Sequence, residues 1–108
     1  MEGHSNRFIV MPSNKTSQMF YTYILQSLKD YDNYIGYTNN LKSRFVEHQK
    51  GHSFSTSFRR PFKLIYYETC LNIDDAKQRE KYLKSTAGRR FLAKRLSHFR
   101  ANLVWHRK

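Results

Sequence analysis

The sequence predicts a small α/β domain in which helices flank a three-stranded antiparallel sheet, in the order ββαβαα. Two aromatic and β-branched runs, residues 20–28 and 34–38, are separated by a polar segment rich in Asp and Asn, as in a β-hairpin. A third such run covers residues 62–69. The stretches that follow the second and third runs carry apolar residues at helical spacing, so we expect helices to cover the sheet.

The first run is apolar on both faces, which is typical of a central strand covered on both sides. In one hairpin register, Leu28 lies opposite Asn33 across a four-residue loop. Tyr23 and Tyr34 then share the face on which Gly36 leaves room. A five-residue loop would place the two phenols on opposite faces. Paired phenols would indicate a reactive pocket, whereas aromatic packing is the commoner role of strand tyrosines.

Capping residues predict the ends of the first helix. Asn39 and Asn40 are N-cap candidates for a helix over residues 41–50, and Gly51 ends it. Residues 53–61 form a polar, basic loop or a short helix before the third strand.

Two further helices follow the third strand. Asp74 and Asp75 lie where the helix dipole favours acidic residues, so the first of these helices begins there and runs to about Ser85. Gly88 separates it from a last helix over residues 89–98.

The length of 108 residues is sufficient for one domain with a single modest core. We expect a flexible leader at residues 1–18, the folded domain at 19–97 and a basic tail at 98–108. Met19 directly precedes the first strand and is an alternative to Met1 as the first residue of the protein. The leader has only a short apolar patch, which is not the core of a signal peptide.

The sequence argues against a membrane protein and against a disulfide framework. No apolar run approaches the ~20 residues that a membrane helix needs. Cys70 is the single cysteine, so no internal disulfide forms and a cytoplasmic location is expected.

The charge of the chain predicts a nucleic-acid partner. Lys and Arg total 20 against 8 acidic residues, which gives a net charge of +12 and a pI near 10.1. A solubility charge or a membrane-surface patch are the alternatives, but the basic residues are spread among aromatic ones, which favours nucleic acid. The expected phosphate contacts are Lys42, Arg59, Arg60, Lys63, Lys84, Arg89 and Arg90, with Lys94 and Arg95 on the same surface.

Polar side chains interrupt the apolar stripe of the first helix. Leu41, Arg44, Phe45 and His48 share one helical face. Because Leu41 and Phe45 must face the sheet, Arg44 and His48 are expected at the edge of the core. An arginine there can direct its planar donors to a phosphate, or its stem can cover the core while its head reaches water.

The second helix has a carboxylate in its apolar stripe. Ile73, Ala76, Glu80 and Leu83 fall on one face. A buried carboxylate needs a partner, so Glu80 either forms a salt bridge to Arg44 or another cation, or binds Mg²⁺ or Mn²⁺.

Taken together, these residues resemble the GIY-YIG nuclease superfamily, in particular its small stand-alone bacterial proteins. The resemblance covers residues 19–97 and is highly specific as an ordered set. Its elements are Tyr21-Thr22-Tyr23, Tyr34-Ile35-Gly36, residues 38–41, Arg44, Glu47-His48, Gly51, Arg60-Pro61 and residues 64–68, 76–80, 83–85 and 88–89. Tyr21 replaces the glycine of the first motif, and no asparagine follows Glu80 before His98, where many members carry one.

The resemblance implies a catalytic set of Tyr23, Tyr34, Arg44, His48 and Glu80. It implies a DNA endonuclease in which Glu80 holds one Mg²⁺ or Mn²⁺ and Arg44 stabilises charge on the phosphorus. Tyr23 and His48 are rival candidates for the general base, because a phenol needs its pKa lowered while imidazole titrates near neutrality. Single-stranded, duplex and branched DNA, and RNA, all stay open as substrates. The alternative is a non-catalytic module that binds nucleic acid through aromatic stacking and basic residues.

Overall fold

The computed structural model describes residues 18–107, with side chains described as far as Asn102. The leader expected at residues 1–18 therefore lies, apart from Gln18, outside the described residues. The elements are, in chain order, β1 (Phe20–Ser27), β2 (Asn33–Thr38), α2 (Leu41–Gln49), the 3-10 helix η1 (Phe54–Arg59), β3 (Phe62–Cys70), α3 (Ile73–Leu83), α4 (Thr86–Arg95) and α5 (Ser97–Arg107).

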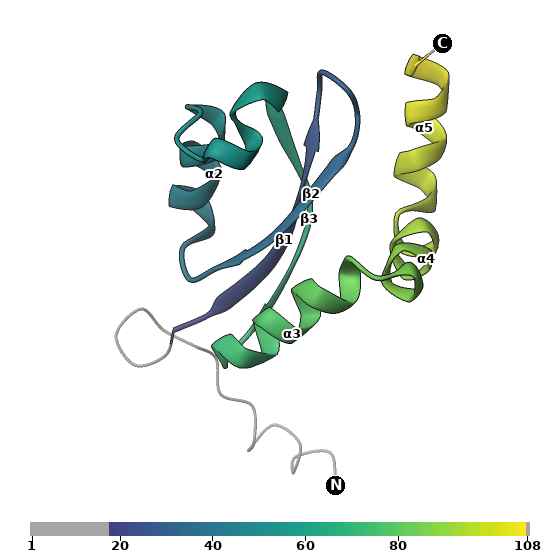
Figure 1. Ribbon diagram of the computed structural model, residues 1–108. Coiled ribbons are helices and arrows are strands. Elements are labelled where there is room, and N and C mark those ends of the chain that lie inside the picture. Colours follow the sequence, from purple (N-terminus) through teal and green to yellow (C-terminus); the bar gives the residue numbers. More distant parts are fainter. Residues whose placement is uncertain (1–17, 108) are drawn as a thin grey trace, which may run out of the picture.

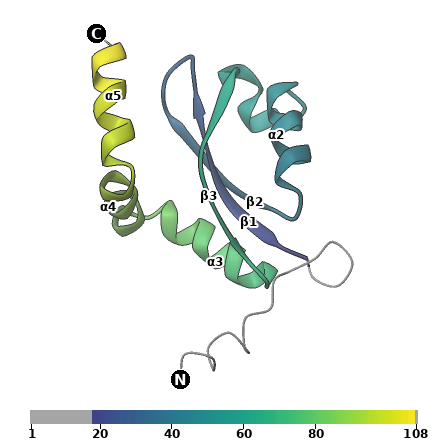
Figure 2. The ribbon, with the colours of Figure 1, turned by 180° about the vertical axis from the view of Figure 1, so that it is seen from behind.

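The three strands form one antiparallel sheet in the order β2-β1-β3. The predicted α/β class is confirmed, and β1 is the central strand, as its apolar pattern on both faces predicts. From Thr22 to Ser27 every side chain of β1 is buried. Helix α2 lies on one face of the sheet, and α3 and α4 lie on the other (Figures 1 and 2).

The hairpin register brings Tyr23 and Tyr34 to the same face of the sheet. Tyr23 pairs with Gly36, and Leu25, the next residue on that face of β1, pairs with Tyr34. The four-residue loop is therefore the correct alternative, and both phenols point toward α2.

The expected pairing of Leu28 with Asn33 was wrong. Instead, the backbone N–H of Ser27 donates to the carbonyl of Asp32 at 2.9 Å. The Ser27 hydroxyl accepts two further backbone N–H groups of the loop, so the turn closes one residue earlier on each strand. The closing pair thus moves by one residue on each strand, which is two residues in total. Because side chains alternate with a period of two, every side chain of the hairpin stays on its predicted face of the sheet.

Two apolar clusters hold the layers together, one on each face of the sheet. On the α2 face, Tyr23, Leu25 and Phe62 are buried. On the opposite face, Ile24 packs with Leu83 of α3 and Leu92 of α4. The apolar faces of α2 and α3 are thus buried against opposite faces of the sheet.

The first helix begins and ends as its sequence predicts. The Asn40 side chain accepts the backbone N–H of Ser43 and caps α2. Gly51 has φ +80, a left-handed conformation that suits glycine after the last turn.

The prediction that Gly88 separates the last two helices was wrong. Helix α4 begins earlier, because the Ser85 side chain accepts the backbone N–H of Gly88 and caps it. A Cβ atom on Gly88 would overlap the backbone of Tyr82 and Leu83, so this glycine permits the close approach of α4 to the end of α3.

A further helix, α5, occupies most of the expected basic tail. The described residues thus form one helix more than the ββαβαα order, in addition to η1. Among the described residues, no helix is both long enough and apolar enough to span a membrane.

Candidate active site

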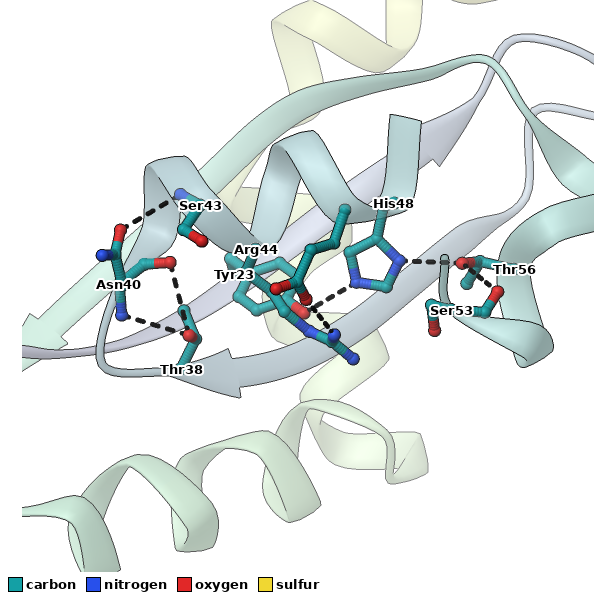
Figure 3. Close-up of polar contacts among 9 residues, drawn as sticks. Tyr23, Thr38, Asn40, Ser43, Arg44, His48, Ser53 and Thr56 are labelled. Carbon is teal, nitrogen blue, oxygen red and sulfur yellow. Dashed lines mark hydrogen bonds and ion pairs between the residues drawn. The ribbon is translucent and has the colours of Figure 1, made fainter. Parts of the chain in front are cut away.

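A chain of hydrogen bonds runs from the central strand through α2 to η1 (Figure 3). The Tyr23 hydroxyl lies 3.0 Å from Nε2 of His48. Nδ1 of His48 lies 2.8 Å from Oγ1 of Thr56, and the Thr56 hydroxyl donates to the Ser53 carbonyl at 3.4 Å. The side chains of Tyr23, His48 and Thr56 are at most 1% exposed.

The hydrogen-bond pattern assigns the protonation of His48. Because the Thr56 hydroxyl donates to a carbonyl, it accepts from Nδ1–H, which leaves Nε2 as the acceptor for the Tyr23 hydroxyl. Burial, together with the positive charge of Arg44, lowers the pKa of His48 to about 4. The imidazole is therefore neutral at pH 7.

The Tyr23 phenol is also neutral in the free protein. Burial raises the pKa of Tyr23 to about 12, although hydrogen bonding to Arg44 opposes this shift. The charges of Tyr34 and Glu80 raise the pKa of Tyr23 further. The lowered phenol pKa that a tyrosine base requires is thus not a property of the free protein.

Tyr34 and Gly36 enclose the phenol and the imidazole. The Tyr34 ring centroid lies 4.9 Å from that of His48 and 6.3 Å from that of Tyr23. A Cβ atom on Gly36 would lie 2.6 Å from the Tyr23 hydroxyl oxygen, so the phenol occupies the space that glycine leaves open. The sequence predicts open space beside Gly36, and in the structure the Tyr23 ring occupies that space.

Arg44 lies beside the phenol at the accessible side of this cluster. Its side chain is 34% exposed, and its Nη1 atom donates to Oε1 of Glu47 at 2.6 Å. The sequence argument missed Glu47 as a partner, although its position three residues after Arg44 is the spacing at which helical side chains meet.

Glu80 approaches this cluster from α3. Its side chain is 20% exposed and accepts a hydrogen bond from Lys84 Nζ at 2.9 Å. The salt-bridge alternative is therefore observed, with Lys84 and not Arg44 as the cation. The influence of Glu80 on the pKa of Tyr23 is electrostatic, without a direct hydrogen bond between the two described side chains.

A single carboxylate such as that of Glu80 suits a hard divalent cation better than zinc, which takes Cys and His ligands. Among the described residues, no group of three or more His, Cys, Asp and Glu side chains gathers closely enough to hold a metal. Mg²⁺ typically binds through one or two carboxylates and completes its shell with water and phosphate oxygens. A single, partly accessible carboxylate such as Glu80 fits that pattern.

The basic residues expected to contact phosphates come from several elements. Lys42 and Arg60 belong to the α2 side of the sheet, where Arg60 lies beside Gly51. Arg59 lies at the hairpin, where it pairs with Asp30. The remaining ones, Lys63, Lys84, Arg89, Arg90, Lys94 and Arg95, belong to β3, α3 and α4.

Two features of the site were beyond the reach of the sequence argument. His48 is fully buried, not at the edge of the core, because η1 covers it. Thr56 supplies the second hydrogen bond of the imidazole from a segment that carries no motif. That contact forms only because η1 packs against α2 in the folded protein.

A match to a known family identifies a nuclease-type domain. The family model of the GIY-YIG catalytic domain matches residues 19–95, and the chain therefore belongs to the GIY-YIG family. The resemblance drawn from the sequence motifs is confirmed.

Three bacterial relatives illustrate the similarity. A UPF0213 protein of Clostridium perfringens is 43% identical over 67 residues, which cover 61% of this chain and 71% of that protein. One from Oceanobacillus iheyensis is 37% identical over 68 residues, or 62% and 78% of the two chains. One from Pediococcus acidilactici is 40% identical over 68 residues, or 60% and 68%. Their names assign no activity, and no solved structure matches the chain significantly.

Proposed function

We propose that this protein is an endonuclease that hydrolyses DNA phosphodiester bonds with the help of Mg²⁺ or Mn²⁺, and that it acts in the cytoplasm. The observation that carries the proposal is the buried contact between the Tyr23 phenol and neutral His48, with the Arg44 guanidinium beside it. A packing tyrosine does not need an oriented proton acceptor behind it. The net charge of +12 supports a polyanionic substrate, with RNA as the alternative to DNA.

Tyr23 and His48 act in series in this proposal. Both ring nitrogens of His48 are engaged, Nε2 with the Tyr23 phenol and Nδ1 with Thr56, so His48 does not meet the attacking water itself. The Tyr23 oxygen instead accepts a proton from that water while its own proton passes to Nε2 of His48. A free phenolate, which a pKa of about 12 disfavours, is then never required. Both rival bases are thus used, Tyr23 facing the water and His48 behind it.

Arg44 stabilises the negative charge that develops on the phosphoryl oxygens. Its guanidinium is partly exposed and adjoins the phenol, so one side chain is able to contact both the substrate and the base. Glu47 holds it in the free protein, and a phosphate must compete with that carboxylate. Tyr34 packs on His48 and limits its orientation.

Glu80 is the proposed metal ligand. A divalent cation bound there would polarise the scissile phosphate and stabilise the leaving oxygen. Lys84 neutralises the carboxylate in the free protein, so the cation replaces one positive partner by another. The partly buried Glu80 carboxylate therefore has a positive partner both in the free protein and in the metal-bound protein.

The rival function is a binding module without catalysis. Phe54 and Phe58 favour it, because their rings are 84% and 74% exposed and lie 6.3 Å apart on η1. Unpaired bases stack on such rings. Binding alone, however, gives no role to the Tyr23–His48 contact.

A cleavage assay separates the two functions. Single-stranded, duplex and branched DNA and single-stranded RNA are incubated with Mg²⁺, Mn²⁺ or EDTA. We expect metal-dependent cleavage by the natural protein, loss of cleavage in Glu80→Gln and Arg44→Ala, and retained DNA binding in Glu80→Gln. Asp75→Asn, which removes an exposed carboxylate from the same helix, is the matched control and should cleave normally. Binding without cleavage in every metal would establish the rival function.

A further inference from the structure

A cavity of about 630 Å³ lies on the face of the sheet opposite α2. It is bounded by the β1–β2 hairpin, α4 and α5, and both ribbon views show α5 standing beside that hairpin (Figures 1 and 2). Its volume falls within the range of about 300–1,000 Å³ that is typical of small-molecule sites. No residue of the proposed catalytic set lines it.

Three arginines from three separate elements converge on this cavity: Arg59, Arg89 and Arg100. Asp32 is the one acidic side chain among the described residues that line it. Neither Arg89 nor Arg100 has an ion pair with a carboxylate in the described part of the chain. Three guanidinium groups around one space repel each other unless an anion is bound between them.

Arg59 is fixed in place and still has an unused donor. Its backbone carbonyl accepts a 2.6 Å hydrogen bond from the buried Ser27 hydroxyl, and its Nε atom pairs with Asp30 at 3.3 Å. The Nη2 atom is buried and has no hydrogen-bond partner among the described residues. Such an unsatisfied donor carries an energetic cost in the free protein.

The rest of the wall suits a flat, partly apolar group. Ile35, Ile65, Leu92, Leu96 and Phe99 supply apolar surface, and the amides of Gln26 and Asn33 supply hydrogen-bonding edges. Lys63 Nζ lies 5.6 Å from the centroid of the Phe99 ring, which adds a further cation near the wall. Phosphate-binding arginines next to an aromatic ring and amides match the two parts of a nucleotide.

We propose that this cavity binds a nucleotide, with its phosphate on Arg59, Arg89 and Arg100 and its base against Phe99 and the apolar wall. The nucleotide is either free or the terminal residue of a nucleic-acid strand. The inference goes beyond the proposed nuclease function, because the cavity and the Tyr23–His48 contact lie on opposite faces of the sheet.

Titration calorimetry tests the proposal with AMP, dTMP, inorganic phosphate, and single-stranded octanucleotides that carry either a 5′-phosphate or a 5′-hydroxyl. Arg89→Ala should weaken nucleotide binding about tenfold or more, since it removes a charge-assisted hydrogen bond. Lys81→Ala is the control for loss of one positive charge: Lys81 lies on α3, is exposed and does not line the cavity. Circular dichroism and thermal unfolding of both variants would establish that each is folded.

The outcomes separate the two ligand sources. Equal affinity for AMP and for the octanucleotides indicates a free-nucleotide site, whereas binding confined to the 5′-phosphorylated octanucleotide indicates a strand-end site. Absence of binding by the natural protein, or equal weakening in Arg89→Ala and Lys81→Ala, would overturn the proposal. Glu80→Gln should bind these ligands normally, so that failure of the nucleotide site and failure of the nuclease function are observed independently.

Discussion

The hydroxyl of Tyr23 lies 3.0 Å from Nε2 of His48, and both side chains are almost completely excluded from solvent. The imidazole, and not bulk water, is therefore the acceptor for the phenol proton. Because Thr56 holds the other ring nitrogen, His48 accepts that proton without rotating. In the proposed reaction, this contact between a strand and a helix would determine the direction of proton transfer.

Tyr23→Phe should lower the cleavage rate by about 10²–10⁴-fold, because it removes the group that receives the proton of water. It should also lower the free energy of unfolding by about 1–3 kcal/mol, because Nε2 of buried His48 loses its partner. Single-turnover cleavage and urea unfolding measure the two effects. Tyr67→Phe, at a half-exposed tyrosine of β3, is the control. Equal activity in the two variants would contradict the role of Tyr23.

Gly36→Ala should destabilise the protein and reduce cleavage, since the new methyl group would displace the Tyr23 phenol from His48. Its cost in unfolding free energy should be smaller in a Tyr23→Phe background, because the oxygen that lies closest to the new Cβ atom is then absent. A double-mutant cycle measures this coupling. Additive costs would show that the alanine acts elsewhere.

The stability of the protein should fall as the pH decreases from 6.5 to 4 because of His48. The unfolded chain binds a proton near pH 6.5, whereas the folded chain binds it only near pH 4, so acid favours unfolding in this interval. The effect reaches up to about 3 kcal/mol and is absent above pH 6.5. Urea unfolding at several pH values compares the natural protein with His48→Gln. Parallel pH profiles for the two proteins would refute this assignment.

Lys84→Gln should reduce the Mg²⁺ concentration needed for half-maximal cleavage by about 2–5-fold, because an exposed ion pair of up to about 1 kcal/mol no longer competes for Glu80. Lys81→Gln removes the same charge from an exposed position of α3 and serves as the control. Metal titrations of cleavage measure both variants. An equal shift in the two would mean that only the overall charge matters.

The amino-acid sequence by itself determined the strands and the central position of β1, and it gave the common face of Tyr23 and Tyr34 as one of two alternatives. It also predicted that Arg44 and Glu80 interrupt apolar stripes. These results rest on local periodicity, because a strand alternates its faces and a helix repeats them regardless of what packs nearby. The even shift in hairpin pairing shows this: the predicted partners were wrong, while every face was correct.

Only the tertiary structure decided which side chains meet across segments. Thr56 reaches His48 because η1 folds over α2, and Gly88 lies inside α4 because Ser85 caps that helix against the end of α3. The arginines of the cavity come from a short helix, α4 and α5, and no spacing in the sequence relates them. Such contacts depend on how the helices pack on the sheet. An apolar stripe determines which face of a helix is buried, but it does not determine which residues of other segments lie next to that face.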